Sequence, residues 1–174
     1  MEESIVIESV TAQSLPEIRD DLVELLRKTV NGGDTVGFLP PISAKESMAF
    51  WNEVREALIG GSRRVLVARR AGRVVGTVQL DLAMQTNGRH RAEVIKLLVR
   101  REVRRQGLGR RLMGAVESLA HDEGRTLLVL DTRQGEPSEV FYATSGYQRV
   151  GVIPNYARSA DGMLHSTVLF YKEL

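Results

Sequence analysis

The sequence predicts an α/β fold with a mixed central β-sheet and helices on both of its faces. The chain has 174 residues, of which 43% are hydrophobic, and can therefore close one sizeable core. Strand-like and helix-like segments alternate without linkers or repeats. A buried apolar strand also runs through an arginine- and glycine-rich turn, residues 99–113, into an amphipathic helix. We expect a single domain over residues 1–174.

The first third of the chain contains two helices with recognisable starts. Ser14 and Glu17 have the spacing of a capping box, and so do Ser43 and Glu46. The glycines and the Pro40-Pro41 pair between these helices indicate a loop. The expected elements are a strand at 4–10, a helix at 14–30, a loop at 31–42 and a helix from 43 to 58 or 59.

The rest of the chain is expected to supply most of the sheet. Ala71-Gly72 and Asn87-Gly88 mark tight turns, and Pro154 lies in a loop before Asp161-Gly162. Gly124 and Gly146 each end a helix. We expect strands at 63–69, 73–82, 91–99, 126–132, 147–153 and 164–171, with helices after the turn at 107 and at 137–145.

The turn before the long helix has the properties of an anion-binding site. Gly107 and Gly109 allow the backbone to approach a ligand closely. The free N–H groups of a helix start and the positive end of its dipole both favour phosphate. Arginines 104, 105, 110 and 111 add positive charge. The spacing fits neither the dinucleotide fingerprint G-x-G-x-x-G nor the Walker loop.

Arg104-x-x-Gly107-x-Gly109, directly after a strand, resembles the motif with which GCN5-related N-acetyltransferases (GNAT) bind the pyrophosphate of acetyl-CoA. The order of predicted elements is similar to that of this family. The resemblance implies acetyl-CoA as cofactor and a central strand that carries a bulge and splays from its neighbour, exposing backbone groups. The cofactor-binding residues that it implies are Leu98, Val99, Arg104, Arg105, Gln106, Gly107, Leu108, Gly109 and Arg110.

A second segment, from Phe141 to Tyr147, resembles the F-Y-x-x-x-G-[FY] motif of the same family. The tyrosine that matches Tyr142 commonly protonates the departing CoA thiolate in these enzymes. The other reading of this aromatic cluster is core packing. The family usually has a proline where Arg101 stands and an asparagine where Gly135 stands, and the second departure removes one expected hydrogen bond to the cofactor.

Acetyl transfer to an amine also requires a base and an oxyanion donor. Glu93 and Asp131 are the best-placed carboxylates, and the family often uses a glutamate near the position of Glu93. Each has the alternative of a structural salt bridge. Backbone N–H groups at Leu98 and Val99 match the family's oxyanion position. Lys96, polar within an apolar strand, either stabilises charge, extends toward water or pairs with an acid.

Three longer stretches, at 28–38, 87–96 and 155–165, resemble the tabtoxin-resistance acetyltransferases, which detoxify a β-lactam amino acid. That resemblance implies a small amino-acid-like acceptor and a role in toxin or antibiotic resistance. Asp34, Phe38, Trp51 and Tyr156 would line the acceptor pocket. Aminoglycosides, polyamines and peptide N-termini stay open as acceptors, and so does a non-catalytic acyl-CoA-binding regulatory module.

Composition argues against several other classes of protein. The 24 basic and 22 acidic residues leave a net charge of +2, which is too balanced for a dedicated nucleic-acid-binding protein. The absence of cysteine excludes disulfides and an acyl-cysteine intermediate, and the three scattered histidines predict no metal site. No apolar stretch or leader-like start suggests a membrane or export. We expect a cytoplasmic enzyme, with a homodimer left open.

Overall fold

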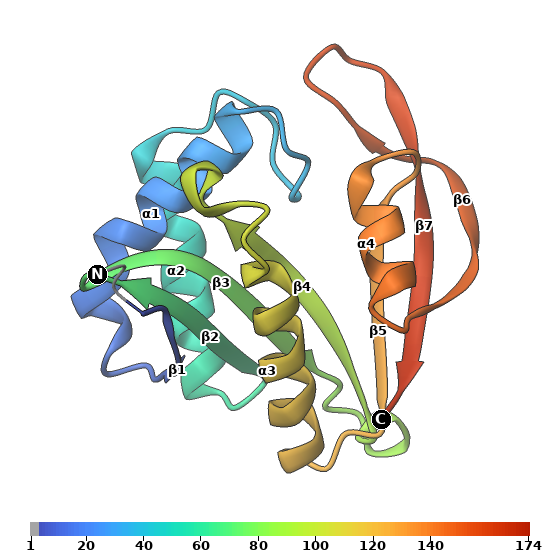
Figure 1. Ribbon diagram of the computed structural model, residues 1–174, viewed down its shortest axis with the longest axis horizontal. Helices are drawn as coiled ribbons and strands as arrows, with labels where there is room; N and C mark the ends of the chain where they lie inside the picture. Colours follow the sequence, from blue (N-terminus) through green and yellow to red (C-terminus); the bar gives the residue numbers. More distant parts are fainter. Residues whose placement is uncertain (1–3) are drawn as a thin grey trace.

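A computed structural model describes residues 4–174 of the chain. Seven strands form one sheet in the order β1-β2-β3-β4-β5-β7-β6, with four helices packed on it (Figure 1). All neighbouring strands are antiparallel except β4 and β5, which are parallel. The strands are β1 (Val6–Val10), β2 (Arg63–Arg70), β3 (Arg73–Leu82), β4 (Arg91–Val99), β5 (Leu127–Arg133), β6 (Gln148–Arg158) and β7 (Leu164–Glu173). The predicted mixed sheet is confirmed.

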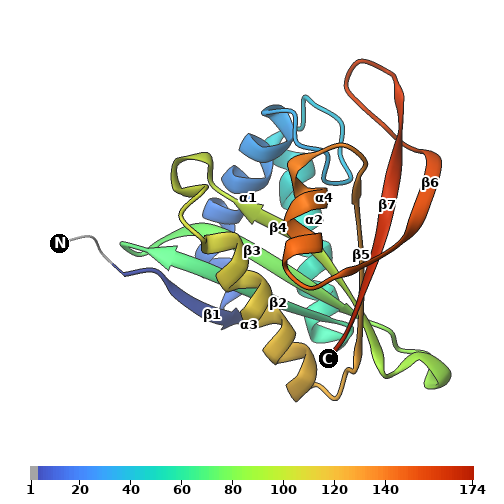
Figure 2. The same cartoon turned by 45° about the vertical axis from the view of Figure 1, so that its right-hand side comes forward.

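The helices cover both faces of the sheet, as the sequence predicts. Helices α1 (Leu15–Asn31) and α2 (Ala44–Ile59) pack on one face, where Leu26 and Trp51 lie in the core. Helices α3 (Leu108–Asp122) and α4 (Pro137–Thr144) cover the other face, and Figure 2 shows them in front of the strands. The helices bury the central strands, whereas β6 at the edge of the sheet is exposed along nearly its whole length. None of the helices described is long and apolar enough to span a membrane.

The two predicted N-cap serines, Ser14 and Ser43, behave differently. Ser43 and Glu46 form the predicted capping box, because the Ser43 Oγ accepts from the Glu46 N–H (3.1 Å) and the Glu46 carboxylate accepts from the Ser43 N–H (2.8 Å). Ser14 makes no such bond to its helix. Its Oγ instead accepts from the N–H of Thr11 (3.0 Å), which closes the turn before α1. The Ser14–Glu17 capping box was therefore wrong, because the hydroxyl has a competing partner upstream.

Strand β6 is longer than predicted. It continues through Pro154 to Arg158, although the sequence places a loop from Pro154 onward. The proline is tolerated because β6 lies at the edge of the sheet and its pairing with β7 is irregular between Ile153 and Ala157. Asn87-Gly88 also differs from the predicted tight turn, since residues 86–88 form a short 3₁₀ helix.

The end of β4 is anchored to α1 by a buried arginine. Arg100 Nε donates to the Val74 carbonyl (2.7 Å), and its Nη2 lies 2.9 Å from the Glu24 carboxylate. The Arg100 side chain is only 1% exposed, so its charge requires these partners. These bonds hold the C-terminal end of β4 against α1 and β3. The side of β4 away from β3 is the side on which β5 lies.

Candidate active site

Strands β4 and β5 pair over only three residues and then separate. Arg91, Ala92 and Glu93 face residues 127–129 of β5, and beyond them the two strands diverge in a V (Figures 1 and 2). The predicted splay is therefore confirmed. The opening is a cavity of about 1170 Å³. Its walls are the 33–39 loop, β4, the start of α3, the end of β5, α4 and the β6–β7 hairpin.

The first turn of α3 forms an anion cradle at one end of this cavity. Gly107 has φ +79°, a left-handed conformation that favours glycine, and Arg105 is left-handed as well (φ +61°). The first helical bond runs from the Arg111 N–H to the Gly107 carbonyl (3.1 Å). Within residues 4–174, the N–H groups of Leu108 and Gly109 find no acceptor. These free donors at the positive end of the helix fit the pyrophosphate of acetyl-CoA.

Gly109 serves a second purpose, which is close packing. A Cβ built on Gly109 would lie 3.4 Å from the ring of Phe141, so glycine lets the start of α3 approach α4. Gln106, by contrast, does not line the cavity. Its side-chain oxygen accepts from Arg70 Nη2 (3.0 Å), which directs it away from the predicted cofactor site.

The arginines of the turn divide into three groups. Arg105 and Arg110 line the cavity beside the cradle. Arg104 also lines it, but its Nε donates to the Val99 carbonyl (2.9 Å) and its Nη2 to the Asp34 carboxylate (2.6 Å). Arg111 donates instead to the carbonyl of Ile5 (2.7 Å) and does not line the cavity. The Arg104–Asp34 pair thus ties the cofactor turn to the loop that was predicted to bind the acceptor.

The predicted bulge lies in the middle of β4. Lys96 and Leu97 together oppose the single residue Val78 of β3, and Lys96 adopts a left-handed conformation (φ +53°). Beyond the bulge, the N–H of Arg100 bonds the Val75 carbonyl (2.9 Å). Antiparallel pairs alternate, so the register directs the Leu98 N–H toward β3 and the backbone of Leu97 and Val99 toward the opening. Leu97 and Val99, and not Leu98, therefore present backbone groups to the opening, so Leu97 is a better candidate than Leu98 for an oxyanion donor.

Tyr142 is held in the cavity wall by aromatic packing. Its ring centroid lies 5.2 Å from that of Phe141, 6.0 Å from that of Tyr147 and 6.2 Å from that of Phe170. No hydrogen-bond partner of its hydroxyl is found in the described part of the chain. Burial, followed by the charge of Asp131, raises the pKa of Tyr142 to about 12. The hydroxyl therefore keeps its proton at neutral pH and can donate it.

Glu93 and Asp131 line the same cavity from neighbouring strands. Glu93 is half-buried, and burial raises the pKa of its carboxyl, with smaller contributions from the charges of Asp131 and Asp81. Asp131 accepts a hydrogen bond from the Thr167 hydroxyl (2.6 Å). No cation lies within 4.0 Å of either carboxylate in residues 4–174. The salt-bridge alternative is therefore not what the structure shows, and both groups are available to a ligand.

Three of the four predicted acceptor residues line the cavity, and Trp51 does not. Asp34, Phe38 and Tyr156 all contribute to its wall. Trp51, a residue of α2, is 0% exposed and lies in the core that α1 and α2 form with the sheet. Its ring centroid lies 5.1 Å from that of Phe50, which in turn packs on Phe38 (5.5 Å) in the cavity wall. An amphipathic helix buries its largest apolar side chain, so Trp51 was wrongly assigned to the pocket.

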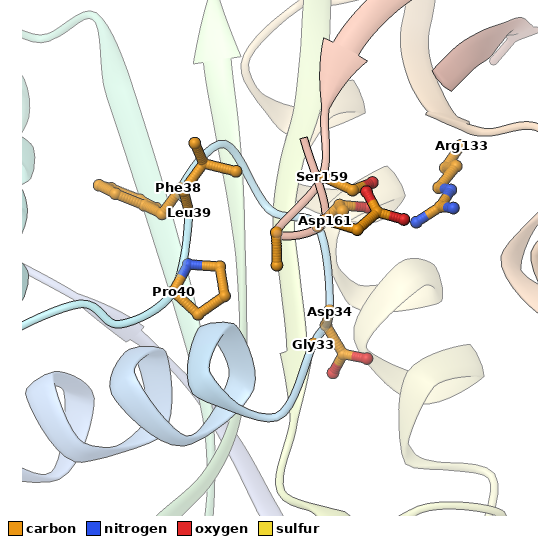
Figure 3. Close-up of a pocket in the computed structure, with 10 residues that line it drawn as sticks. Gly33, Asp34, Phe38, Leu39, Pro40, Arg133, Ser159 and Asp161 are labelled. Carbon is orange, nitrogen blue, oxygen red and sulfur yellow. The ribbon is translucent and has the colours of Figure 1, made fainter. Parts of the chain in front are cut away.

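A smaller cavity of about 190 Å³ adjoins the main cavity beside the 33–39 loop and the β6–β7 loop. Figure 3 shows Arg133 directed toward Ser159 and Asp161 of the β6–β7 loop, while the Asp34 carboxylate turns away from them. Arg133 Nη2 also lies 3.0 Å from both ring nitrogens of His165, and its Nε is 3.7 Å from the Glu136 carboxylate. This end of the site therefore carries cations as well as carboxylates.

Sequence reasoning missed Arg133, His165 and Thr167, all of which line the main cavity. They come from β5 and β7, whose adjacency depends on long-range strand order. The available signal was weak, because all three lie in polar runs at strand ends, namely Asp131-Thr132-Arg133 in β5 and His165-Ser166-Thr167 in β7. Lys96, a polar residue within an apolar stretch of β4, was noted without a definite role.

Comparisons with known proteins agree with this geometry. The sequence profile described as the acetyltransferase (GNAT) family matches residues 32–147. Among solved structures, ribosomal-protein-alanine N-acetyltransferase from Brucella melitensis is 21% identical, with 97% of this chain and 99% of that chain covered and a TM-score of 0.76. The Salmonella typhimurium protein yncA, solved with its cofactor acetyl-CoA, is 16% identical, with 98% and 94% covered and a TM-score of 0.76. Aminoglycoside 6′-acetyltransferase type Ii is 23% identical, with 97% and 96% covered and a TM-score of 0.73.

The structural likenesses establish the fold, and the profile match covers well over half of the chain. The protein therefore belongs to the acetyltransferase (GNAT) family. It is an acetyltransferase that uses acetyl-CoA, the donor of this family, and the free N–H groups at the start of α3 are consistent with that donor.

Proposed function

We propose that the protein transfers the acetyl group of acetyl-CoA to the primary amine of a small amino-acid-like acceptor, by direct attack while both substrates are bound. The observation that carries this proposal is one cavity lined by an anion cradle at Gly107, the Tyr142 hydroxyl and the carboxylates of Glu93 and Asp131. A base, an acid and a phosphate site in one cleft are the components that acetyl transfer requires.

The start of α3 would hold the pyrophosphate through its free N–H groups, with Arg105 and Arg110 adding charge. The open edge of β4 beyond the bulge would bind the pantetheine arm through the backbone of Val99. The bound cofactor supplies a thioester, an activated acetyl group whose leaving group is a thiol. These contacts leave the remaining space between β4 and β5 for the acceptor.

Glu93 would remove the proton that keeps an amine acceptor from attacking. An alkylammonium has an ordinary pKa near 10, so a base is needed at neutral pH. The raised pKa of Glu93 strengthens it as a proton acceptor. Asp131, held by Thr167, would orient the ammonium beside it. A backbone N–H at Leu97 would stabilise the negative charge on the acetyl oxygen.

Tyr142 would complete the reaction by donating its hydroxyl proton to the departing sulfur. Its pKa of about 12 keeps the proton in place until the C–S bond breaks. The aromatic rings around it hold the hydroxyl in one position, which is what a general acid needs. The net change is a new C–N bond and a broken C–S bond. The ammonium loses two protons, of which one leaves to solvent through Glu93 and the other replaces the proton that Tyr142 gives to the thiol.

Aminoglycosides are the principal rival acceptors, and the acidic pair Glu93 and Asp131 is the observation in their favour. Such acceptors carry several positive charges, which Lys96 and Arg133 in the same cavity would repel. An amino-acid-like acceptor satisfies both signs of charge. Likeness to the tabtoxin-resistance enzymes makes a β-lactam amino acid, and hence toxin resistance, the leading specific case.

A thiol-release assay with acetyl-CoA and four acceptor classes would test this proposal. The classes are the twenty amino acids, β-lactam amino acids, kanamycin-type aminoglycosides and short peptides. We expect release with an amino-acid-like acceptor and the N-acetyl product by mass spectrometry. Thiol release with aminoglycosides alone would show that the acceptor is an aminoglycoside and not an amino acid. Binding of acetyl-CoA without thiol release for any acceptor would favour a regulatory module.

A further inference from the structure

Lys96 combines two costly features in the wall of the active-site cavity. Its backbone is left-handed (φ +53°), a conformation that strains a residue with a side chain. Its ammonium is half-buried, and burial followed by the charge of Arg63 lowers its pKa. Backbone strain and a buried charge that do not stabilise the fold are typical of binding sites. The mechanism proposed above uses neither.

The surroundings of the Lys96 ammonium form a box that is open toward the cavity. Its Nζ lies 5.8 Å from the ring centroid of Phe38 and 5.7 Å from that of Phe50. Gly37 forms a third wall, where a Cβ would come within 3.1 Å of Nζ. The aromatic faces stabilise a positive charge by cation–π attraction. They provide no acceptor for the three N–H donors of the ammonium.

No residue in the described part of the chain supplies that acceptor. No carboxylate lies within 4.0 Å of Lys96 Nζ, and Nζ makes no hydrogen bond there. Glu93 and Asp131 act on its pKa only at longer range. An ammonium with three open donors and no counter-ion, facing a ligand cavity, fits an anionic group of the ligand.

The other cations of the cavity either have partners or lie at its α3 end. Arg104 is bonded to Asp34, and Arg105 and Arg110 lie at the α3 end with the phosphate cradle. Arg133 contacts His165 and the Glu136 carboxylate, and Arg158 donates to the Gly162 carbonyl (2.6 Å). Lys96 is thus the cation at the acceptor end for which residues 4–174 offer no partner.

We propose that Lys96 binds the carboxylate of the acceptor. The acceptor would then span the cavity with its ammonium toward Glu93 and Asp131 and its carboxylate in the Lys96 box. This arrangement selects molecules that carry both charges, namely amino acids, against amines without a carboxylate. The inference deepens the proposed function and rests on it.

The test compares amino acids with their carboxamides, which keep the amine and lose the negative charge. Four proteins are assayed for kcat/KM by thiol release: wild type, Lys96→Met, Arg133→Met and Lys45→Met, an exposed lysine at the start of α2. We expect wild type to prefer the acid over the amide by about 10- to 100-fold, the range of a charge-assisted hydrogen bond. Lys96→Met should reduce that preference to about one, through KM for the acid.

A binding measurement separates recognition from folding and catalysis. Calorimetry on the CoA complex should show weaker amino-acid binding in Lys96→Met, while CoA affinity and the melting temperature match those of Lys45→Met. Methionine has a similar length without the charge, so packing against Phe38 and Phe50 is retained.

The alternative outcomes separate the two proposals. If wild type acetylates acids and amides equally, or if Arg133→Met rather than Lys96→Met loses the preference, the Lys96 assignment is overturned while acetyl transfer to amines stands. If no amine promotes thiol release from wild type, the proposed function fails and the Lys96 assignment fails with it.

Discussion

At the scale of single residues, the site depends on side chains whose protonation the fold has altered. Tyr142 is the clearest example, since three aromatic neighbours both position its ring and exclude water from it. Its raised pKa, about 12, leaves a neutral hydroxyl that can donate a proton throughout the physiological range. Removing that hydroxyl should therefore affect proton donation and little else.

We predict that Tyr142→Phe lowers kcat by about 100-fold, since general acid catalysis commonly contributes 10²–10⁴-fold. Acetyl-CoA affinity should stay within about twofold of wild type, because the ring packing is retained. Steady-state thiol release and calorimetry measure the two quantities. Tyr171→Phe is the matched control, because the Tyr171 hydroxyl bonds Gln148 at the exposed sheet edge (2.7 Å). Equal turnover in the Tyr142 and Tyr171 variants would exclude Tyr142 as the acid.

Glu93 makes a second residue-scale prediction, which concerns stability. Its pKa in the folded protein is raised, chiefly by burial, so the unfolded chain loses its proton first as pH rises. The folded state therefore loses stability between the unfolded pKa of 4.5 and the higher folded pKa. Glu93→Gln has no charge to bury and escapes this loss.

We accordingly expect the variant to gain stability relative to wild type as pH rises from 4 to 8, and to lose activity. Urea unfolding at both pH values measures the difference, with Glu53→Gln on the exposed side of α2 as control. A Glu93→Gln protein less stable than wild type at pH 8 would mean that the Glu93 charge is stabilised by an ion pair, the alternative that the sequence left open.

At the scale of elements, a substitution in the first turn of α3 can be compared with one in a hairpin turn, which distinguishes an effect on backbone strain from an effect on ligand binding. Gly107 and Gly72 both have left-handed φ, +79° and +76°, and a Cβ at either would meet no atom within 4 Å. Gly72 belongs to the β2–β3 hairpin, whereas Gly107 faces the cavity. Valine at either position should cost a similar free energy of unfolding, about 1–2 kcal/mol.

We predict that Gly107→Val also weakens acetyl-CoA binding at least tenfold, because its side chain enters the anion cradle and disturbs the free N–H groups. Gly72→Val should leave the affinity unchanged. Urea unfolding and calorimetry of both variants measure strain and affinity independently. The cradle interpretation does not survive if the two variants bind acetyl-CoA equally well.

Helices and strands that local patterns determine could be predicted from the sequence. Features that depend on contacts between distant segments could not. Apolar periodicity and glycine ends predicted α3 and its turn, because those signals act within a few residues. The boundary of β6 was wrong because tolerance of Pro154 depends on its being an edge strand. Trp51 was misplaced for a related reason: which face of α2 meets the core depends on how α1 packs on it.

The candidate site shows the same division. The motif residues Gly107 and Tyr142 line the cavity, as their spacing predicted. The Arg104–Asp34 pair joins residues 70 positions apart, and the Lys96 box joins β4 to the 37–38 loop and to α2. Such contacts come from tertiary packing, so no local pattern in the sequence predicts them.

At the scale of the whole molecule, the V between β4 and β5 leaves the two portions of the sheet weakly joined, so a cofactor bound there would bridge them. Only three residue pairs join these strands, so the β1–β4 and β5–β7 portions of the sheet share little hydrogen bonding. The cavity between them is lined by β4 and α3 on one side and by β5, α4 and β7 on the other, so a ligand that filled it would contact both portions. Binding should therefore stabilise the junction as well as the site itself.

We predict that CoA at 100 times its dissociation constant stabilises the protein by about 2.7 kcal/mol. Hydrogen exchange should then slow at Leu97 and Val99, in the first turn of α3 and in α4, which lie on both sides of the V. The distant strand β1 should be unchanged, since it pairs only with β2 at the other edge of the sheet. Thermal unfolding and exchange mass spectrometry with and without CoA measure these effects. Slower exchange confined to the first turn of α3 would show that the cofactor is held by its phosphates alone and does not bridge the two portions of the sheet.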